Sequence, residues 1–341
     1  MVMLPIGSII QFLESAMDGC LSLLRPAISG AAVTVITLSG HVAWSQTTKT
    51  IKIVIPSPPG GGSEMLARVL AGQISQAQGP TMVIENRPGA GTIIGTEAVA
   101  RAAPDGNTLL ITSTAFVVNP HLRKSSYDPL TSFEPICYLA SIPQVIAVNS
   151  ASPYLTLAQL LSAARAKPGE LTIASIGPAT ANQIGFEKFK RAANVNMTFV
   201  PFPSSTPAVT ALLGRHVTSM VGGSAEVAEQ VKAGKLRALA IASRTRIALL
   251  PEVPTVAEAG YSDFDLDIWS GVFAPAKTPK DTVAQLAGWF TEALRTPAAK
   301  ATLELQGYTS IGVCGSDFAA SLSKQYYDYG RIIREANIKA E

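Results

Sequence analysis

The residues best suited to chemistry form a glycine-rich turn early in the chain. An apolar segment at 51–56, IKIVIP, runs into Pro58–Glu64, which reads PPGGGSE. The prolines stop a strand, and the glycines allow positive φ angles and close approach of a ligand to the backbone. A turn that feeds a helix N-terminus presents unpaired N–H groups and the positive end of the helix dipole. The sequence therefore predicts an anion-binding turn.

Two common phosphate-binding motifs do not fit this turn. No Lys-Ser or Lys-Thr pair follows the glycines, as in a Walker loop, and the spacing is not that of a dinucleotide fingerprint. Ser63 can cap the helix that follows. Glu64 is expected to stabilise the helix dipole, although it would compete with a bound anion if it pointed into the site. Arg68, one turn later, is either an anion clamp or a surface residue.

Four further loops are small and rich in glycine or hydroxyl groups, and each follows a predicted strand. They are residues 86–92 (NRPGAGT), 113–115 (STA), 175–182 (SIGPATAN) and 222–225 (GGSA). If they converge on one cleft, they supply many N–H and O–H donors and few fixed charges. Such donors can hold a carboxylate through neutral hydrogen bonds and waters.

Groups for catalysis or metal binding do not accompany these loops. Ser113 and Ser175 have no nearby histidine candidate, and no G-x-S-x-G motif occurs. His121 and His216 lack the spacing of metal ligands. We therefore expect no enzyme, no metal site and no cofactor.

The composition indicates a globular protein without a nucleic-acid partner. The chain has 341 residues, of which 47% are hydrophobic, and a net charge of +3. It contains no run of Lys and Arg that could follow a phosphate backbone. We expect a monomer.

Short apolar strands alternate with amphipathic helices along most of the chain, which predicts an α/β fold with mostly parallel sheets. We expect helices near 64–78, 93–101, 157–166, 182–193, 207–213 and 225–233, a loop after the strand TLLIT and a long strand near 137–148. The segment DLDIWSGVFAPAKTP is expected to be extended, and amphipathic helices should follow it to the C-terminus. Crossings near 145–149 and 266–275 would join two lobes as a hinge, with the ligand site in the cleft between them. The predicted lobes are 46–146 with 268–341, and 147–267.

The first 45 residues are almost free of charge and predict an export signal. Arg25 precedes an apolar stretch at 26–42, and Ala43-Trp44-Ser45 fits a small-x-small cleavage site. Cleavage near Ser45 would release a periplasmic chain from Gln46. A membrane anchor is the alternative, although the polar residues and glycines of the stretch make it weak for a permanent span.

Two cysteines lie outside this signal, Cys137 and Cys314. A single disulfide bond could form in an oxidising compartment, but we expect two buried free thiols.

Six ordered sequence blocks between Ile51 and the C-terminus resemble one known family. They are PPGGGSEMLAR, VIENRPGAGTIIGTEAVARAAPDGNTLL, KPGELTIASIG, GKLRALAIASRTR, LPEVPTVAEAGY and WSGVFAPAKTP. The chain is similar to the substrate-binding proteins of tripartite tricarboxylate transporters, the Bug family. The resemblance implies a type II periplasmic binding protein fold, in which two Rossmann-like lobes joined by a two-crossing hinge close on a small carboxylate.

The resemblance also implies which residues hold the carboxylate, partly through waters. They come from the first glycine turn, the loop after TLLIT and the helix start in the second lobe: Gly60, Gly61, Gly62, Ser63, Ser113, Thr114, Ala179, Thr180 and Asn182. Phe202, Gly223 and Ser224 complete the candidate ligand contacts. Packing in the core is the usual role of Phe202, as of Tyr127 and Trp269.

The sequence departs from the family pattern at several of these positions. Glu64 replaces the usual Asp, Gln183-Ile184 replaces His-Leu, Phe202-Pro203-Ser204 replaces Tyr-Lys-Gly, and Gly222-Gly223 replaces a Phe-Asp element. The second-lobe changes remove a hydroxyl, a cation and a carboxylate, and so are compatible with an atypical, less polar ligand.

The resulting hypothesis is a periplasmic solute-binding protein that presents a small organic carboxylate to the membrane permease of a tripartite transporter. The alternatives are an exported sensor component without a transport role, and an enzyme built on the same two lobes.

Overall fold

Residues 50–77, 79–177, 180–261, 264 and 266–339 are described by a computed structural model of the chain. They belong to one compact unit, Thr47–Glu341, whereas the other unit, Met1–Gln46, lies outside the described residues. The predicted export signal therefore lies outside the described residues.

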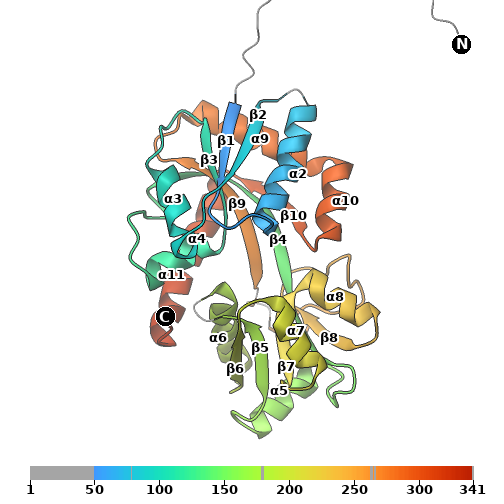
Figure 1. The fold of residues 1–341 in the computed structure, drawn as a ribbon. Coiled ribbons are helices and arrows are strands. Elements are labelled where there is room, and N and C mark those ends of the chain that lie inside the picture. The colour runs from blue at the N-terminus through green and yellow to red at the C-terminus, as the bar shows by residue number, and fades with distance from the viewer. Residues whose placement is uncertain (1–49, 78, 178–179, 262–263, 265, 340–341) are drawn as a thin grey trace, which may run out of the picture. The chain divides into compact units, whose positions relative to one another are not determined.

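The first lobe is built on a mixed sheet that combines strands from both ends of the chain (Figure 1). The strand order is β2-β1-β3-β9-β4, with β10 beside β4. β1 runs parallel to β2 and β3, whereas β9 is antiparallel to both β3 and β4. The strands are β1 (Thr50–Ile55), β2 (Thr81–Asn86), β3 (Thr108–Ser113), β4 (Phe133–Asn149), β9 (Asp267–Pro275) and β10 (Thr309–Cys314).

Helices pack against this sheet and connect its strands. They are α2 (Gly62–Gln76), α3 (Ile93–Ala100), α4 (Ala115–Leu122), α9 (Lys280–Arg295), α10 (Pro297–Leu305) and α11 (Ser316–Glu335), with the short 3-10 helix η2 (Ala90–Thr92) before α3. The C-terminal helices thus complete the first lobe.

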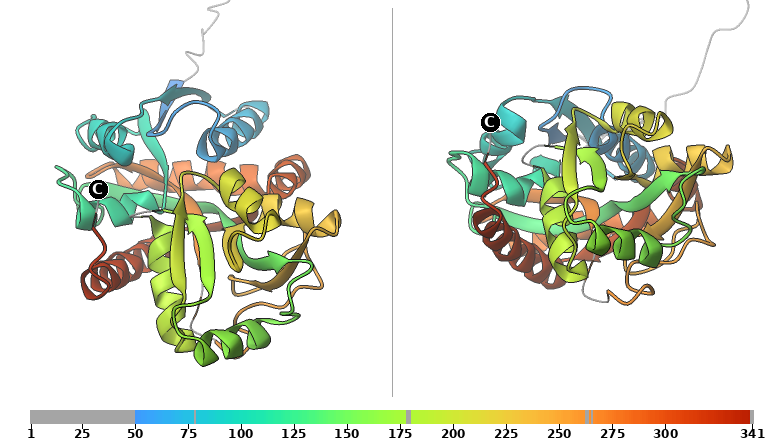
Figure 2. Two further views of the ribbon diagram at one scale, coloured as in Figure 1. Left: turned by 60° about the horizontal axis from the view of Figure 1, so that its bottom comes forward. Right: turned by 90° about the horizontal axis from the view of Figure 1, so that it is seen from below.

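The second lobe has its own sheet, in which β5 runs parallel to β6 and β7, and β4 is antiparallel to β7 and β8. Its strands are β5 (Thr172–Ile176), β6 (Thr198–Phe202), β7 (Ser219–Gly223) and β8 (Leu236–Ile241). Its helices are α5 (Leu157–Ala166), α6 (Ala181–Ala193), α7 (Ser205–Leu213) and α8 (Ser224–Lys232). Figure 2 shows α11 near this lobe, where it packs against α6.

The long strand β4 belongs to both sheets and forms the first crossing. Its residues up to Pro143 pair with β9, and those from Gln144 onward pair with β7 and β8. The chain returns just before β9: the Leu266 N–H donates to Ala242 O at 2.7 Å, and Asp267 already pairs with Pro143. The two-crossing hinge is confirmed, with the return placed ahead of β9 rather than inside it.

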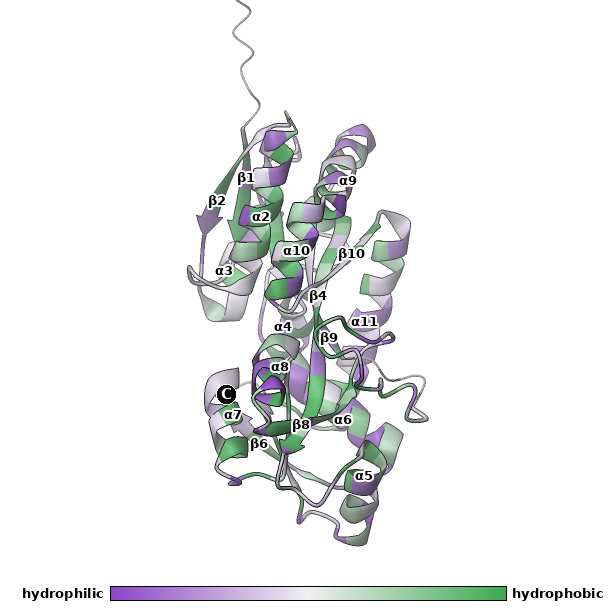
Figure 3. Cartoon of the chain, turned by 90° about the vertical axis from the view of Figure 1, so that its right-hand side faces the viewer, coloured by the Kyte–Doolittle hydropathy of each residue, from purple (hydrophilic) through white to green (hydrophobic). Residues whose placement is uncertain are grey.

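Each lobe has an apolar core that explains its helices. Leu66, Leu70 and Ile74 recur at helical spacing on α2, and each is at most 2% exposed. Burying one such side chain contributes about 2 kcal/mol. In the second lobe, α6 buries Phe186 and Phe189 in the same manner. Figure 3 shows hydrophobic residues along β1 and β4, whereas α9 carries both kinds.

Most predicted elements are confirmed, and two segments differ. The helix predicted at 157–166 is α5 with the same bounds. The expected loop after β3 is instead the helix α4, which buries Phe116, Val117 and Val118 in succession and contains Pro120, so it lacks an amphipathic pattern. The segment 309–314, predicted within a run of helices, is the strand β10, whose partner β4 lies far away in sequence.

The expectation of two free thiols is wrong, because Cys137 and Cys314 form a disulfide bond. They lie opposite each other on β4 and β10 although 177 residues separate them. Sequence distance hid this pairing, since only the strand register brings the two cysteines together. The bond joins the first crossing strand to the last strand of the first lobe.

Candidate functional site

The first glycine turn forms the N-terminus of α2, but its geometry differs in detail from expectation. Gly60 has a φ of +85°, which only glycine adopts without strain. The helix begins at Gly62, with Gly61 as the capping residue and without a side-chain cap. Ser63 therefore does not cap α2, because it already lies inside the helix.

Glu64 folds back onto the turn and binds it from within. Its carboxylate accepts hydrogen bonds from the Gly60 N–H at 2.8 Å and from the Asn86 side chain at 3.2 Å, and it pairs with Arg68 at 2.6 Å. The Gly60 bond, followed by Arg68, lowers the pKa of Glu64 below its ordinary value. Arg68 is thus a partner of Glu64, and an incoming anion would find the Gly60 N–H already taken.

Further along the described turn, the N–H groups of Gly62 and Ser63 are not bonded to Glu64. Among the hydrogen bonds of the described residues, none has the N–H of Gly62 or Ser63 as its donor. Gly62 also lies against Tyr308, whose hydroxyl would be 2.4 Å from a Cβ atom at this position. Tyr308 is bonded to Ser270, and burial raises the pKa of Tyr308 to about 12. A tyrosine from the C-terminal part of the lobe therefore packs against the turn.

A cavity of about 280 Å³ lies between the two lobes. Such a volume suits a small molecule. The first lobe contributes the end of β3, the start and end of α4 and the loop before α3, and the second lobe contributes the start of α6. The lining residues are Gly91, Ser113, Thr114, Ala115, Val118, Asn119, Arg123, Thr180, Ala181, Asn182 and Ile268. Four predicted site residues, Ser113, Thr114, Thr180 and Asn182, thus come together.

The first-lobe wall is held to the returning strand β9. Thr114 precedes α4 and is fully buried, and its hydroxyl oxygen accepts a hydrogen bond from the Trp269 N–H at 3.1 Å. Ser113 lies opposite Ser270 in the pairing of β3 with β9. The start of α4 is consequently fixed to the strand that follows the second crossing.

The second-lobe wall is the N-terminus of α6. The Thr180 hydroxyl donates to Ile176 O at 2.8 Å and accepts from the Gln183 N–H at 3.4 Å, which makes Thr180 the capping residue. The Asn182 side-chain nitrogen donates to the Gln144 side chain at 3.0 Å and to the Ser175 hydroxyl at 3.3 Å. Because Gln144 follows the crossing in β4, Asn182 ties this helix start to the hinge.

The loop that leads into α3 is strained where it lines the cavity. Ala90 and Thr92 have positive φ angles of 47° and 87°, and the neighbouring Gly89 and Gly91 also have positive φ. Such angles are unfavourable for side chains with a Cβ atom, above all for branched ones. The buried side chain of Asn119 donates to Gly91 O and to the Thr92 hydroxyl, and thereby holds the loop in place.

Sequence reasoning missed Asn119 and Arg123 because Asn119 lies on α4 and Arg123 directly follows it, in a segment that was interpreted as a loop. Their signal was indirect: both follow the STA loop by a few residues, within reach of any ligand held there. Gly91 belonged to a predicted loop but was not selected as a ligand contact.

The remaining predicted residues lie elsewhere. Among the described residues, those of the glycine turn do not line this cavity, Phe202 packs against the second-lobe core, and Gly223 is buried at the start of α8. Ala179 lies outside the described residues. Ser224 is buried, and its hydroxyl donates to Gly307 O at 2.9 Å.

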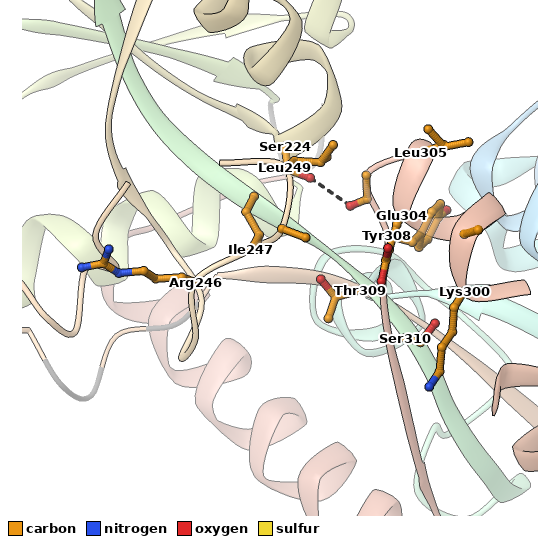
Figure 4. Close-up of a pocket in the computed structure, with 13 residues that line it drawn as sticks. Ser224, Arg246, Ile247, Leu249, Lys300, Glu304, Leu305, Tyr308, Thr309 and Ser310 are labelled. Atoms are coloured by element: carbon orange, nitrogen blue, oxygen red, sulfur yellow. Dashed lines mark hydrogen bonds between the residues drawn. The ribbon is translucent and has the colours of Figure 1, made fainter. Parts of the chain in front are cut away.

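Ser224 borders a second cavity, of about 600 Å³, which Figure 4 shows between the two lobes. Its walls include Ile247, Leu249 and Tyr308, and the Arg246 side chain points away toward Glu258, with which it forms an ion pair at 3.0 Å. Of the predicted site residues it gathers Ser224 alone, among those described.

The described residues hold no cluster of three or more His, Cys, Asp or Glu side chains that could bind a metal ion. His121 is packed against Tyr326 and bonded to its carbonyl oxygen at 2.8 Å, and burial lowers the pKa of His121. Over the same part of the chain, no helix combines the length and the apolar character needed to cross a bilayer.

Known proteins resemble this chain along most of its length. The family model described as the tripartite tricarboxylate transporter family receptor matches residues 66–338. Protein BugT of Bordetella pertussis is 32% identical over 294 residues, covering 85% of this chain and 90% of BugT. The solved periplasmic binding protein BugD is 30% identical, with a TM-score of 0.67 over 86% of this chain and 99% of BugD. R. palustris Rpa4515, solved with adipate, is 28% identical, with a TM-score of 0.70 over the same shares.

Proposed function

The chain belongs to the tripartite tricarboxylate transporter receptor family, and we propose that it is an exported solute-binding protein that captures a small organic carboxylate between its lobes. The observation that carries this proposal is the 280 Å³ cavity, where the start of α4 meets the start of α6. The adipate in the related Rpa4515 supports a carboxylate as the ligand class.

The donors for the carboxylate are backbone N–H groups and hydroxyls. On α6, Thr180 accepts hydrogen bonds from Gln183 and Ile184, so in the described structure the N–H groups of Ala181 and Asn182 remain for a ligand. The dipoles of α4 and α6 add positive potential at their N-termini. On the opposite wall, the Thr114 hydroxyl accepts from Trp269 and keeps its proton for donation.

We assign the other predicted residues supporting roles in the same function. The N–H groups of Gly62 and Ser63 form a second set of donors on lobe closure, and Gly60 and Gly61 shape the turn. Phe202 and Gly223 end β6 and β7, the two strands that pair with β5 ahead of α6. Because the Ser224 hydroxyl is bonded to Gly307, it holds the lobes together rather than binding the ligand.

Export to the periplasm is part of the proposal, with cleavage near Ser45 and release of a monomer that delivers its ligand to a membrane permease. The Cys137–Cys314 disulfide bond supports it, because such bonds persist in oxidising compartments. Mass spectrometry of the exported protein tests the cleavage, and an intact chain that retains Met1 or Met17 would contradict it.

Ligand binding is tested by thermal shift over di- and tricarboxylates, aromatic acids, amino acids and nicotinate, followed by titration calorimetry. A ligand at about 100 times its Kd adds roughly 2.7 kcal/mol of stability. We expect at least one acid to stabilise the protein and to reduce its radius of gyration in small-angle scattering, since both lobes contact it. Stabilisation by none of these acids would refute the proposal.

The position of the site is tested by Ala181→Asp, which places a carboxylate where the ligand carboxylate should bind. The helix dipole favours an acid there, but Ala181 is only 8% exposed, so circular dichroism of the variant accompanies the titration. We expect a folded variant that has lost binding. Ser205→Asp is the matched control, because it adds the same charge at the start of α7, outside the cavity lining. Normal binding by Ala181→Asp would mean that the site lies elsewhere.

A further inference from the structure

One cationic side chain, that of Arg123, lines the 280 Å³ cavity. Arg123 directly follows α4, and its exposed side chain reaches the loop before α3. A Cβ atom at Gly91 would lie 3.7 Å from the Arg123 Nε and 3.9 Å from its Cζ. The guanidinium group therefore lies beside Gly91, at van der Waals distance from the position that a Cβ atom would take.

Arg123 has no counter-charge from the protein. Within the described part of the chain it forms no ion pair and no side-chain hydrogen bond, whereas Arg68 pairs with Glu64 and Arg101 pairs with Glu97. A guanidinium group stays protonated and offers a planar fork of donors that matches a carboxylate. Its charge is thus available to a molecule in the cavity.

The cavity consequently offers two different positions for negative charge. One consists of neutral donors at the starts of α4 and α6, and the other is the Arg123 guanidinium at the opposite end of α4. A ligand with one carboxylate satisfies only one position. A linear ligand with a carboxylate at each end satisfies both.

On the basis of the proposed function, we propose that Arg123 is the specificity-determining residue, which selects ligands with a second, distal anionic group. Hydrogen bonds of Asn119 fix the backbone around Arg123. Asn119 fixes Gly91 O one helical turn before Arg123, and the Arg123 N–H donates to Asn119 O at 2.8 Å. The strained loop and the end of α4 are therefore linked before a ligand arrives, which fixes the backbone from which the Arg123 side chain extends and lowers part of the ordering cost of binding.

The experiment compares each diacid with its own monoamide by titration calorimetry: succinate with succinamate, and likewise glutarate and adipate. Each pair has the same length and differs in one charge. We expect the wild-type protein to bind the best diacid at least about tenfold more tightly than its monoamide, as fits a charge-assisted hydrogen bond. In Arg123→Gln this ratio should fall to about twofold or less, with the monoamide affinity nearly unchanged.

Arg123→Lys and Lys124→Gln are the controls. Lysine keeps the charge without the fork, so the diacid preference should be partly retained. Lys124 carries the same charge one residue further along the exposed chain, outside the cavity lining, so Lys124→Gln should keep the full ratio.

The outcomes separate this inference from the proposed function. Equal affinity for diacid and monoamide in the wild-type protein, or an unchanged ratio in Arg123→Gln, refutes the role of Arg123 while carboxylate binding stands. An equal fall of the ratio in Lys124→Gln also refutes it, since general surface charge would then be the cause. If wild-type protein binds none of these acids in this assay, the inference fails together with the carboxylate function.

Discussion

Gly62→Ala should destabilise the protein through one identified contact, the hydroxyl of Tyr308. A Cβ atom at Gly62 would stand 2.4 Å from that oxygen and 3.4 Å from the ring carbon that carries it. Tyr308 is 5% exposed and bonded to Ser270, so its ring has little freedom to move aside. Overpacking of this kind costs about 1–3 kcal/mol, and we expect about 2 kcal/mol.

The same geometry predicts that removing the Tyr308 hydroxyl abolishes most of the destabilisation caused by Gly62→Ala. Tyr308→Phe alone should cost about 1 kcal/mol through the lost hydrogen bond to Ser270. In that background the nearest ring atom is an ordinary neighbour of the new Cβ atom, so Gly62→Ala should cost less than about 0.5 kcal/mol. The two substitutions should therefore show a coupling energy of about 1.5 kcal/mol or more.

Urea unfolding of the four proteins in this cycle measures that coupling, and Gly61→Ala is the matched control. Gly61 has a φ of −80°, and the nearest atoms to a Cβ there lie 3.7 Å away. Its substitution should therefore be close to neutral. The reasoning is wrong if Gly62→Ala is as stable as Gly61→Ala, or if its cost is the same with Tyr308 and with Phe.

Three further predictions concern other contacts. Replacing Cys137 and Cys314 by Ser should lower the free energy of unfolding by about 3–5 kcal/mol, because the bond closes a loop of 177 residues. Urea unfolding measures this difference. Added reductant should lower the stability of the wild-type protein but not that of the variant. Asn182→Leu should cost about 1–3 kcal/mol, because the Gln144 side-chain oxygen and the Ser175 hydroxyl oxygen lose the hydrogen bonds that they accept from Asn182 in a buried position. The substitution should also weaken ligand binding in calorimetry, and unchanged stability would count against the link between α6 and the hinge. The pKa of Glu64 is lowered in the folded state, so its contribution to stability is present above the ordinary Glu pKa of about 4.3 and is lost as the pH falls through the folded pKa. Wild-type stability should therefore fall more steeply than that of Glu64→Gln below about pH 5, and parallel pH profiles from urea unfolding would contradict this.

Local patterns in the sequence were sufficient for most of the fold. The spacing of Leu157, Leu160, Leu161 and Ala164 predicts α5 with the observed bounds, because one face of that helix is buried and the other is not. α4 could not be found in this way. Its residues are buried in succession, so no periodicity separates it from a strand or a loop.

The candidate site was predictable where a loop follows a strand in the same lobe. Ser113 ends β3, Thr114 follows it, and Thr180 follows β5, so the carboxyl edges of two sheets bring them to one cavity. The contacts that the sequence concealed depend on register or on side-chain direction. Glu64 turns back onto Gly60, and the hydroxyl of Ser224 is taken by Gly307 from the C-terminal part of the chain.

The order of strands in the first lobe has a consequence for how the chain matures. β4 is flanked by β9 and β10, which are the last two strands in the described part of the chain, whereas the second-lobe strands β5 to β8 follow one another directly. Contacts close in sequence form faster than distant ones. We therefore expect the second lobe to fold before the first lobe has paired β9 and β10 with β4. Because Cys314 ends β10, its bond to Cys137 can form only after β10 has paired with β4, and so would report completion of the first lobe.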